Sequence, residues 1–332
     1  MTTAVLFDEI GGPDVLRLEE VTLREPEQGE VRLRVDAIGL NRAEALFRSG
    51  TYVYPANLPG SRIGYEAAGV VEAVGEGVEG FAPGDAVSTV PTFPMTDYGT
   101  YADSAILPAR ALVHRPDGVD AVTGAATWMA YTTAYGLLIE FGRINPGDTV
   151  LVNAASSSVG LAAIQVANHI GAVPIATTRT HAKRQRLLDA GAAHVIATEE
   201  EDLVKEVAAV TGGRGVELAV DAVMGPAVTT LIQTVAPDGT LLFYGWLDPT
   251  PAPMPIAPDF RGRNIRTYAF TELTVENEPM LRRAKHFIDA GLRIGSLSPL
   301  IDRSFDLTDV VAAHRHLESN TQFGKIVLTV RR

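Results

Sequence analysis

Two stretches near the middle of the chain contain residue types that bind phosphate. The first is ASSSVG at 155–160, which separates a short apolar segment from a segment with helical spacing. The second is RTHAKR at 179–184, where Arg179 and Lys183 could each form charge-assisted hydrogen bonds to a phosphate, worth roughly 1.5–3 kcal/mol apiece. Together they indicate the binding of a phosphorylated ligand.

The elements around the first stretch would place a phosphate at a helix start. Residues 149–152 alternate too little for a half-exposed strand, which predicts a strand buried on both faces. After the turn, one helical face carries Val159, Ala162, Ala163, Val166 and Ile170. Unpaired N–H groups and the helix dipole favour an anion between strand and helix. Only Gly160 of a G-x-G-x-x-G pattern is present, so a strand–helix unit that binds nothing is the alternative.

The second stretch follows the next predicted strand, 173–177, about twenty residues after the turn. An NAD-binding protein would carry Asp or Glu there for the ribose 2′-hydroxyl. This chain has no carboxylate at 177–184 but three cations, Arg179, Lys183 and Arg184, of which Arg179 and Lys183 could bind a 2′-phosphate. NADPH is therefore predicted over NADH. The alternative is the solvated first turn of a helix, where cations would oppose the helix dipole.

Composition and charge exclude several other classes. The 332 residues are 46% hydrophobic, which suits one large or two smaller globular domains. A net charge of −12 argues against nucleic acid or an anionic membrane surface as a partner. No apolar run approaches the roughly 18 residues that span a bilayer, and the first residues lack a signal-peptide pattern. The protein is predicted to be cytoplasmic.

The chain contains no cysteine, which excludes disulfides, cysteine nucleophiles and cysteine-based zinc sites. The seven histidines have no metal-ligand spacing; His314 and His316, two apart in a helical stretch, point to different faces. No metal site is predicted. A G-x-S-x-G elbow is absent as well, so hydrolase chemistry has little support.

The organisation changes near residue 122. Residues 1–122 are dense in short β runs with Gly and Pro between them, which predicts a β-rich domain. A helical stretch at 121–141 then leads into alternating strands and helices, which predict a doubly wound parallel sheet over 123–267. Residues 268–332, with a helix at 280–290, are predicted to return to the first domain. The six sheet strands are expected at 149–153, 173–177, 194–198, 216–223, 240–245 and 264–270.

The order of motifs resembles the medium-chain dehydrogenase/reductase superfamily, in its zinc-free quinone oxidoreductase branch. The matching segments cover nearly the whole chain: GGPDVL at 11–16, AIGLNRAEALFRSGTY at 37–52, GYEAAGVVEAVGEGVEGFAPGDAV at 64–87, TTAYGLL at 132–138, PGDTVLVNAASSSVG at 146–160 and GKIVL at 324–328. The resemblance implies a GroES-like catalytic domain with an inserted Rossmann domain and NADPH in the cleft between them. It also implies a homodimer paired through the strand at 264–270.

Three positions distinguish the zinc-dependent relatives. Where they carry the zinc ligands, this chain has Asn41, Tyr65 and, near the TTAY run, Met129. These three side chains cannot form a normal catalytic zinc set, so the Lewis-acid mechanism of alcohol oxidation is not expected.

Without a metal, the remaining reaction is hydride transfer to an acceptor that conjugation already activates. The resemblance places Asn41 and Tyr52 at the nicotinamide end, with Tyr65 as a third catalytic candidate. A tyrosine hydroxyl can stabilise a developing oxyanion or deliver a proton. The alternatives are a partly buried aromatic for Tyr52 and a core tyrosine for Tyr65.

The resemblance also assigns a cofactor-binding set. Asn41 and Thr133 would approach the nicotinamide, and the turn at 155–160 the pyrophosphate. Thr178, Arg179 and Lys183 would hold the 2′-phosphate, although Thr198 stands where some relatives place a tyrosine beside it. The turn comprises Ala155, Ser156, Ser157, Ser158, Val159 and Gly160, and the set is completed by Phe243, Tyr244, Gly245 and Lys325.

The leading hypothesis is an NADPH-dependent reductase of quinones or α,β-unsaturated carbonyls. One alternative is an enoyl-thioester reductase of fatty-acid or polyketide metabolism. Another is an NADPH-binding protein with a structural or sensing role. The sequence does not name the substrate, because specificity depends on pocket shape and loops.

Overall fold

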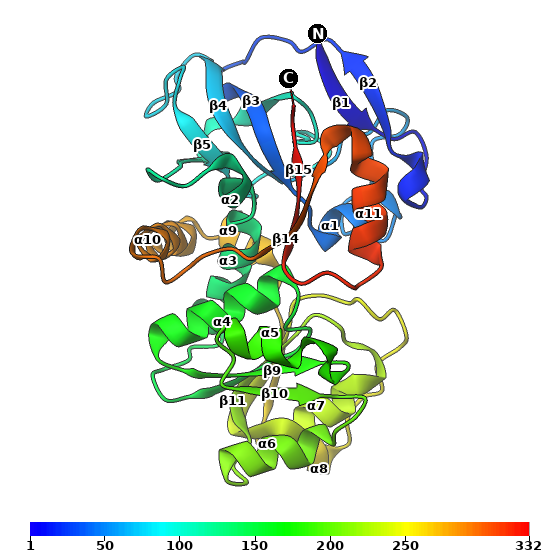
Figure 1. Ribbon diagram of the computed structural model, residues 1–332, viewed down its shortest axis with the longest axis vertical. Helices are drawn as coiled ribbons and strands as arrows, with labels where there is room; N and C mark the ends of the chain where they lie inside the picture. Colours follow the sequence, from blue (N-terminus) through cyan, green and yellow to red (C-terminus); the bar gives the residue numbers. More distant parts are fainter. Residues whose placement is uncertain (332) are drawn as a thin grey trace. The chain divides into compact units, whose positions relative to one another are not determined.

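The computed structural model describes residues 1–331 and divides the chain into two compact units (Figure 1). Unit 1 contains residues 1–129 and the C-terminal segment from Ser298, and unit 2 contains residues 130–297. Unit 2 is thus inserted into the sequence of unit 1. The predicted fold class is confirmed: a β-rich domain with an inserted doubly wound domain.

Unit 1 is built on a seven-stranded sheet with the order β14-β15-β3-β4-β5-β7, in which β6 also pairs with β3. The C-terminal strand β15 pairs antiparallel with β3, so that Val327 lies opposite Gly39, and Gly39 lies opposite Glu66 of β4. The register therefore brings residues from three distant parts of the sequence to one place. The strands are β3 (Glu30–Gly39), β4 (Glu66–Val74), β5 (Ala86–Thr89), β6 (Ser104–Pro108), β7 (Leu112–His114), β14 (Ile301–Asp306) and β15 (Lys325–Thr329).

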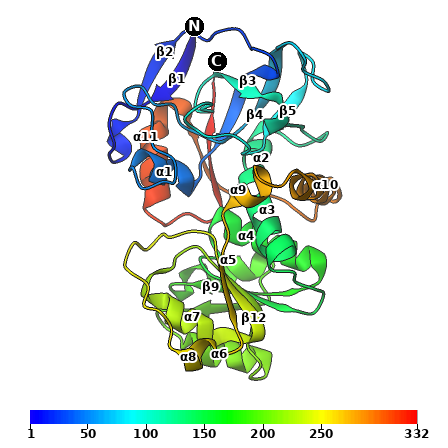
Figure 2. The ribbon, with the colours of Figure 1, turned by 180° about the vertical axis from the view of Figure 1, so that it is seen from behind.

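The other elements of unit 1 are short (Figure 2). An antiparallel hairpin joins β1 (Thr2–Leu6) and β2 (Arg17–Val21). Helix α1 begins directly after β3, because Asn41 forms a capping box with Glu44. The helices are α1 (Arg42–Arg48), α2 (Ala121–Ala125) and α11 (Val310–Glu318), with 3-10 turns η1 (Pro13–Val15), η2 (Ala109–Ala111) and η6 (Leu307–Asp309).

Unit 2 contains a six-stranded sheet, every pair of which is parallel, with the order β10-β9-β8-β11-β12-β13. Its central strand β8 is buried along its whole length, as predicted for a sheet covered on both faces. The strands are β8 (Thr149–Val152), β9 (Val173–Thr178), β10 (His194–Ala197), β11 (Val216–Asp221), β12 (Val235–Phe243) and β13 (Asn264–Thr267).

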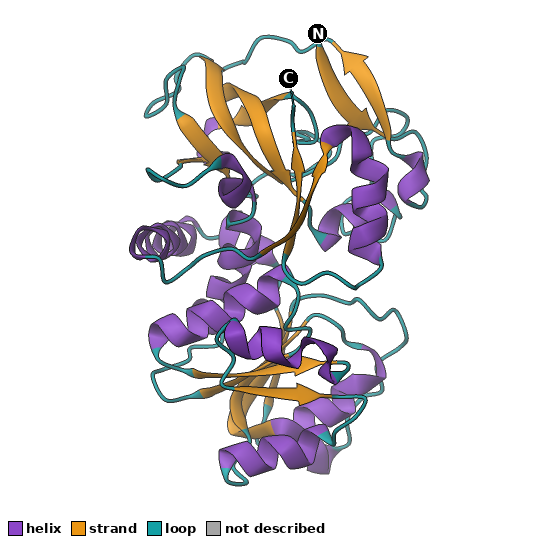
Figure 3. Cartoon of the chain, in the orientation of Figure 1, coloured by secondary structure: helices purple, strands orange, loops and turns teal. Residues whose placement is uncertain are grey.

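Helices cover both faces of this sheet, with α4 and α5 on one face and α6 and α7 on the other (Figures 1 and 3). Helix α4 begins after Ser157, whose side chain accepts a hydrogen bond from the backbone of Gly160, and it ends at Gly171, which has a φ of 88°. The helices are α4 (Ser158–Ile170), α5 (Arg184–Asp189), α6 (Leu203–Thr211), α7 (Val228–Thr234), α8 (Ala257–Phe260), α9 (Phe270–Thr274) and α10 (Glu278–Ile294), with 3-10 turns η4 (His181–Lys183) and η5 (Gly225–Ala227).

The single helix expected at 121–141 is three elements: α2, α3 (Trp128–Tyr135) and the π-helical turn η3 (Gly136–Phe141). The π-helical turn begins at Gly136, where a Cβ atom would lie 2.2 Å from the hydroxyl of Tyr268. Glycine is needed there because the two segments approach so closely.

The structure divides the chain at 129/130 and 297/298, whereas the sequence placed the divisions at 122/123 and 267/268. The second difference arises from α10, which the sequence assigned to the returning segment. Arg283 of α10 donates two hydrogen bonds of 2.8 Å to Glu140, and Phe287 packs on Tyr135 with ring centroids 5.2 Å apart. These contacts belong to unit 2.

None of the helices within residues 1–331 has both the length and the apolar character to cross a bilayer.

Candidate active site

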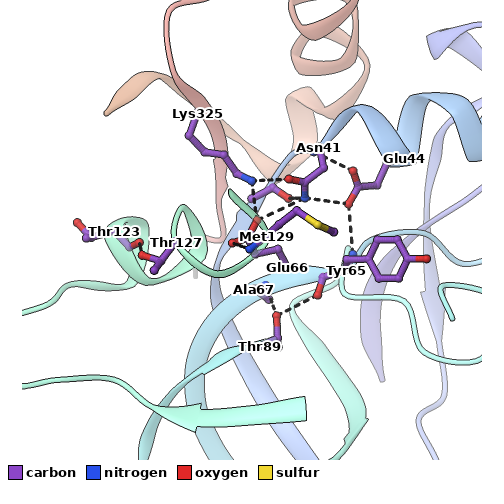
Figure 4. Close-up of polar contacts among 11 residues, drawn as sticks. Asn41, Glu44, Tyr65, Glu66, Ala67, Thr89, Thr123, Thr127, Met129 and Lys325 are labelled. Carbon is purple, nitrogen blue, oxygen red and sulfur yellow. Dashed lines mark hydrogen bonds and ion pairs between the residues drawn. The ribbon is translucent and has the colours of Figure 1, made fainter. Parts of the chain in front are cut away.

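A buried ion pair lies where β3, β4 and β15 meet (Figure 4). The Nζ atom of Lys325 is 2.5 Å from Oε2 of Glu66 and donates a hydrogen bond of 2.6 Å to Oδ1 of Asn41. Lys325 is 1% exposed and Glu66 is fully buried. Removing one member of such a pair is strongly destabilising, because the remaining charge stays buried without compensation.

The pair needs a glycine beside it. A Cβ atom at Gly39 would lie 1.9 Å from the carbonyl oxygen of Ala125 and 2.8 Å from Cε of Lys325. The second carboxylate oxygen of Glu66 accepts a hydrogen bond of 3.0 Å from the backbone of Met129. Both ends of the Glu66 carboxylate are therefore occupied.

Glu44 extends the network toward Tyr65. Its Oε2 accepts a hydrogen bond of 2.8 Å from the backbone of Asn41, and its Oε1 accepts bonds of 3.3 Å from Nδ2 of Asn41 and from the backbone of Tyr65. Burial raises the pKa of the Glu44 carboxyl from 4.5 to about 7, against the opposing charge of Lys325. The carboxyl thus titrates near neutral pH.

Tyr52 and Tyr65 form a pair of phenols beside this network. Their hydroxyl oxygens are 3.4 Å apart, and their rings meet edge to face with centroids 6.4 Å apart. Tyr65 is buried and Tyr52 is half-buried. Burial raises the pKa of both hydroxyls above their usual range, so both remain protonated at neutral pH and are able to donate a hydrogen bond.

The three positions that match zinc ligands in the resemblance lie within or beside the network. Asn41 uses Oδ1 to accept from Lys325, and Tyr65 and Met129 donate their backbone N–H groups to Glu44 and Glu66. Over residues 1–331 there is no cluster of three or more His, Cys, Asp or Glu side chains that could hold a metal ion.

In unit 2 the two predicted phosphate-binding stretches lie together. Nζ of Lys183 donates a hydrogen bond of 3.0 Å to Oγ of Ser156, which joins the turn to the segment after β9. Gly160 approaches the turn closely, since a Cβ atom there would lie 2.7 Å from Cα of Ala155. The hydroxyl of Ser157 accepts a hydrogen bond of 3.0 Å from the backbone of Gly160 and so caps α4.

The remaining predicted cofactor residues lie at the end of β9, in α3 and at the end of β12. Arg179 is exposed and Thr178 is half-buried at the end of β9, beside Lys183 in sequence. Arg184, the third cation of this stretch, forms an ion pair with Glu201. Thr133 is buried in α3, Phe243 is the last residue of β12, and Tyr244 and Gly245 follow it.

Sequence reasoning missed Glu44 and Glu66. It assigned Lys325 to the cofactor set, and the structure places the ammonium of Lys325 in the ion pair with Glu66. The sequence does contain features that mark these residues. Asn41 and Glu44 have the spacing of a capping box. Lys325 is the single charge of β15, and Glu66 begins a mostly apolar strand whose one other charge is Glu72. A charge in such a strand requires a buried partner, but the sequence does not say which one.

Two family models match the chain. The alcohol dehydrogenase GroES-like domain matches residues 27–117, and the model described as zinc-binding dehydrogenase matches residues 158–285. A quinone oxidoreductase of Homo sapiens is 30% identical over 328 residues, which are 98% of this chain and 97% of that protein. A 2-haloacrylate reductase of a Burkholderia species is 29% identical over 333 residues, 99% of each chain.

A solved structure is similar over nearly the whole chain. The quinone oxidoreductase of Escherichia coli, complexed with NADPH, has a TM-score of 0.90 and 28% sequence identity, and the match covers 98% of this chain and 99% of that one. The similarity therefore extends through both units and is not limited to a single domain.

The titration of Glu44 predicts a pH-dependent stability. Because the folded pKa of about 7 lies above the ordinary value of 4.5, the unfolded chain loses this proton first as pH rises. The wild-type free energy of unfolding should therefore fall, relative to Glu44→Gln, by about 3 kcal/mol between about pH 4.5 and 7. Urea denaturation at both pH values measures this difference.

The exposed Glu79→Gln is the matched control for this experiment, because it makes the same substitution outside the buried network. If Glu44→Gln also kept a constant difference from the wild type, the Glu44 carboxyl would not titrate in the folded protein as described.

Proposed function

Because the chain belongs to the medium-chain dehydrogenase/reductase superfamily, in its quinone oxidoreductase branch, and is an oxidoreductase, we propose that it uses NADPH to reduce a quinone or an α,β-unsaturated carbonyl without zinc. The proposal that zinc takes no part rests on the side chains at the three positions where zinc-dependent relatives have their ligands. Asn41, Tyr65 and Met129 offer no thiolate or imidazole, and Oδ1 of Asn41 already accepts from the ammonium of Lys325.

The residues of unit 2 fit NADPH. The turn at 155–160 opens α4 and suits a pyrophosphate, since a helix start favours an anion. Lys183 is held against this turn by Ser156, and Arg179 is exposed nearby in sequence, so we assign both to the 2′-phosphate. Thr178 adds a hydroxyl to the same group.

NADPH supplies a hydride from C4 of its nicotinamide. When hydride adds to a carbon of a conjugated acceptor, an acceptor oxygen becomes an enolate or phenolate and then takes a proton. We propose that this oxygen accepts a hydrogen bond from the neutral hydroxyl of Tyr52. The hydroxyl of Tyr65, 3.4 Å from that of Tyr52, would support this contact. Asn41 and Thr133 remain proposed contacts of the nicotinamide.

An acceptor panel tests the proposal. The protein should oxidise NADPH with 1,4-benzoquinone, 9,10-phenanthrenequinone or a 2-alkenal, and Tyr52→Phe should lower kcat by about 10²-fold or more, because a positioned acid contributes about that factor. Tyr54→Phe, whose ring lies 6.0 Å from that of Tyr52, is the matched control. The measurement is the loss of NADPH absorbance in the steady state.

Other results of this panel would replace the proposal. Turnover confined to crotonyl thioesters would support an enoyl-thioester reductase. Tight NADPH binding with no turnover on any acceptor would indicate a structural or sensing protein.

The cofactor assignment predicts a selective loss. Replacing Arg179 and Lys183 by Ala should weaken NADPH binding by about 10²-fold, from two charge-assisted hydrogen bonds, and leave NADH nearly unchanged. Isothermal titration with both dinucleotides measures the two dissociation constants. Arg186→Ala, on the neighbouring helix α5, is the control. An equal loss of both dinucleotides would show that these cations do not bind the 2′-phosphate.

We also propose a homodimer formed through β13, which lies at one of the two edges of the sheet. All four of its side chains are exposed, including Ile265. Such an edge offers unpaired backbone groups to a second copy. Light scattering should give twice the chain mass for the wild type and for the exposed control Val210→Lys, and a lower mass for Ile265→Lys. A wild-type monomer would refute the dimer.

A further inference from the structure

We propose that Asp221 and Asn153 form a positioning pair that holds the cofactor turn of unit 2 in its binding conformation. This inference rests on the proposed function, since it assumes that the turn binds the pyrophosphate of a dinucleotide. Neither residue belongs to the predicted cofactor set. Asn153 directly follows β8, and Asp221 is the last residue of β11, the neighbouring strand.

The pair is part of a hydrogen-bond chain along the carboxyl edge of the sheet. Nδ2 of Asn153 donates to Oδ1 of Asp221 at 2.6 Å, and Oγ1 of Thr177 in β9 donates to Oδ1 of Asn153 at 2.5 Å. The chain thus joins the ends of three adjacent strands. Ligands of doubly wound sheets bind outside this edge, so the hydrogen-bond chain lies where the cofactor is expected to bind.

Asp221 also holds the segment that follows β11. Its Oδ1 accepts a hydrogen bond of 2.9 Å from the backbone of Val223, and its Oδ2 accepts one of 2.7 Å from the backbone of Met224. Its side chain is fully buried, so water does not compete for these bonds. One carboxylate therefore links the turn after β8 to the segment after β11.

Two residues have backbone conformations that L-residues rarely adopt: one follows Asn153 directly, and the other donates its backbone N–H to Asp221. Ala154, which follows Asn153 and opens the turn, has a φ of 52°, and Met224 has a φ of 60°. Such conformations persist only where surrounding contacts fix them, and they cluster at functional sites. The hydrogen bonds of Asp221 and Asn153 supply those contacts on both sides of the edge.

The carboxylate is specific for this role because all three of its partners are donors. An asparagine at 221 would keep one oxygen acceptor and direct an NH₂ group against an N–H donor, either Nδ2 of Asn153 or the backbone of Met224. Asp221→Asn therefore changes the hydrogen bonds at almost constant volume, which makes it the sharpest substitution for a test.

The test compares three ligands by isothermal titration: NADPH, NADH and adenosine 2′-monophosphate. Asp221→Asn should raise the dissociation constants of both dinucleotides by the same factor, about tenfold or more, because both contain the pyrophosphate. Adenosine 2′-monophosphate lacks the pyrophosphate, so its binding should change less than about twofold. This pattern differs from that expected of the Arg179 and Lys183 substitutions, which act on the 2′-phosphate.

Ile232→Ala, a buried substitution in α7, controls for a general loss of stability, because it should lower the melting temperature without selecting between the ligands. If Asp221→Asn does not fold, Asn153→Ala provides the same comparison and leaves the bonds of Asp221 to 223 and 224 in place.

Unchanged dinucleotide binding, or an equal loss with adenosine 2′-monophosphate, would overturn the positioning role alone. A wild-type protein that binds neither dinucleotide would overturn the proposed function and this inference with it.

Discussion

The ion pair between Lys325 and Glu66 is the constraint on which unit 1 depends. Two opposite charges are buried together, and the pair is tolerable only if each oxygen and each proton finds a partner. Asn41 accepts a hydrogen bond from the ammonium, Met129 donates one to the second oxygen of Glu66, and Gly39 supplies the space. The pair therefore fixes the register of β15 on β3 and of β3 on β4, and with it the start of α1.

The two units position their buried polar side chains in different ways. Unit 1 uses a lysine on β15 and a glutamate on β4, the two strands that flank β3, together with an amide and a second glutamate at the start of α1. Unit 2 uses the ends of parallel strands, where Thr177, Asn153 and Asp221 line one edge. In both, a side-chain amide joins groups from strands far apart in the sequence. An asparagine can do so because it donates and accepts at the same time.

Much of unit 2 could be predicted because its signals are local. Apolar β-branched runs predict the six strands, and the turn before Gly160 marks the start of α4. The buried network of unit 1 could not be predicted in the same way, since Lys325 and Glu66 are 259 positions apart and no local pattern pairs them. Helix α10 lies in unit 2, whereas the sequence placed it in the returning segment, for a related reason: its amphipathic pattern predicts a buried face but does not say which unit covers it.

The insertion of unit 2 also has a consequence for biosynthesis. A ribosome releases residues 130–297 before β14 and β15, so unit 2 is complete while the sheet of unit 1 still lacks its final strands. During that interval the Glu66 carboxylate has no ammonium partner. Unit 1 can acquire its native core only after β15 has been synthesised, and a nascent chain would need to keep this half-built sheet from aggregating.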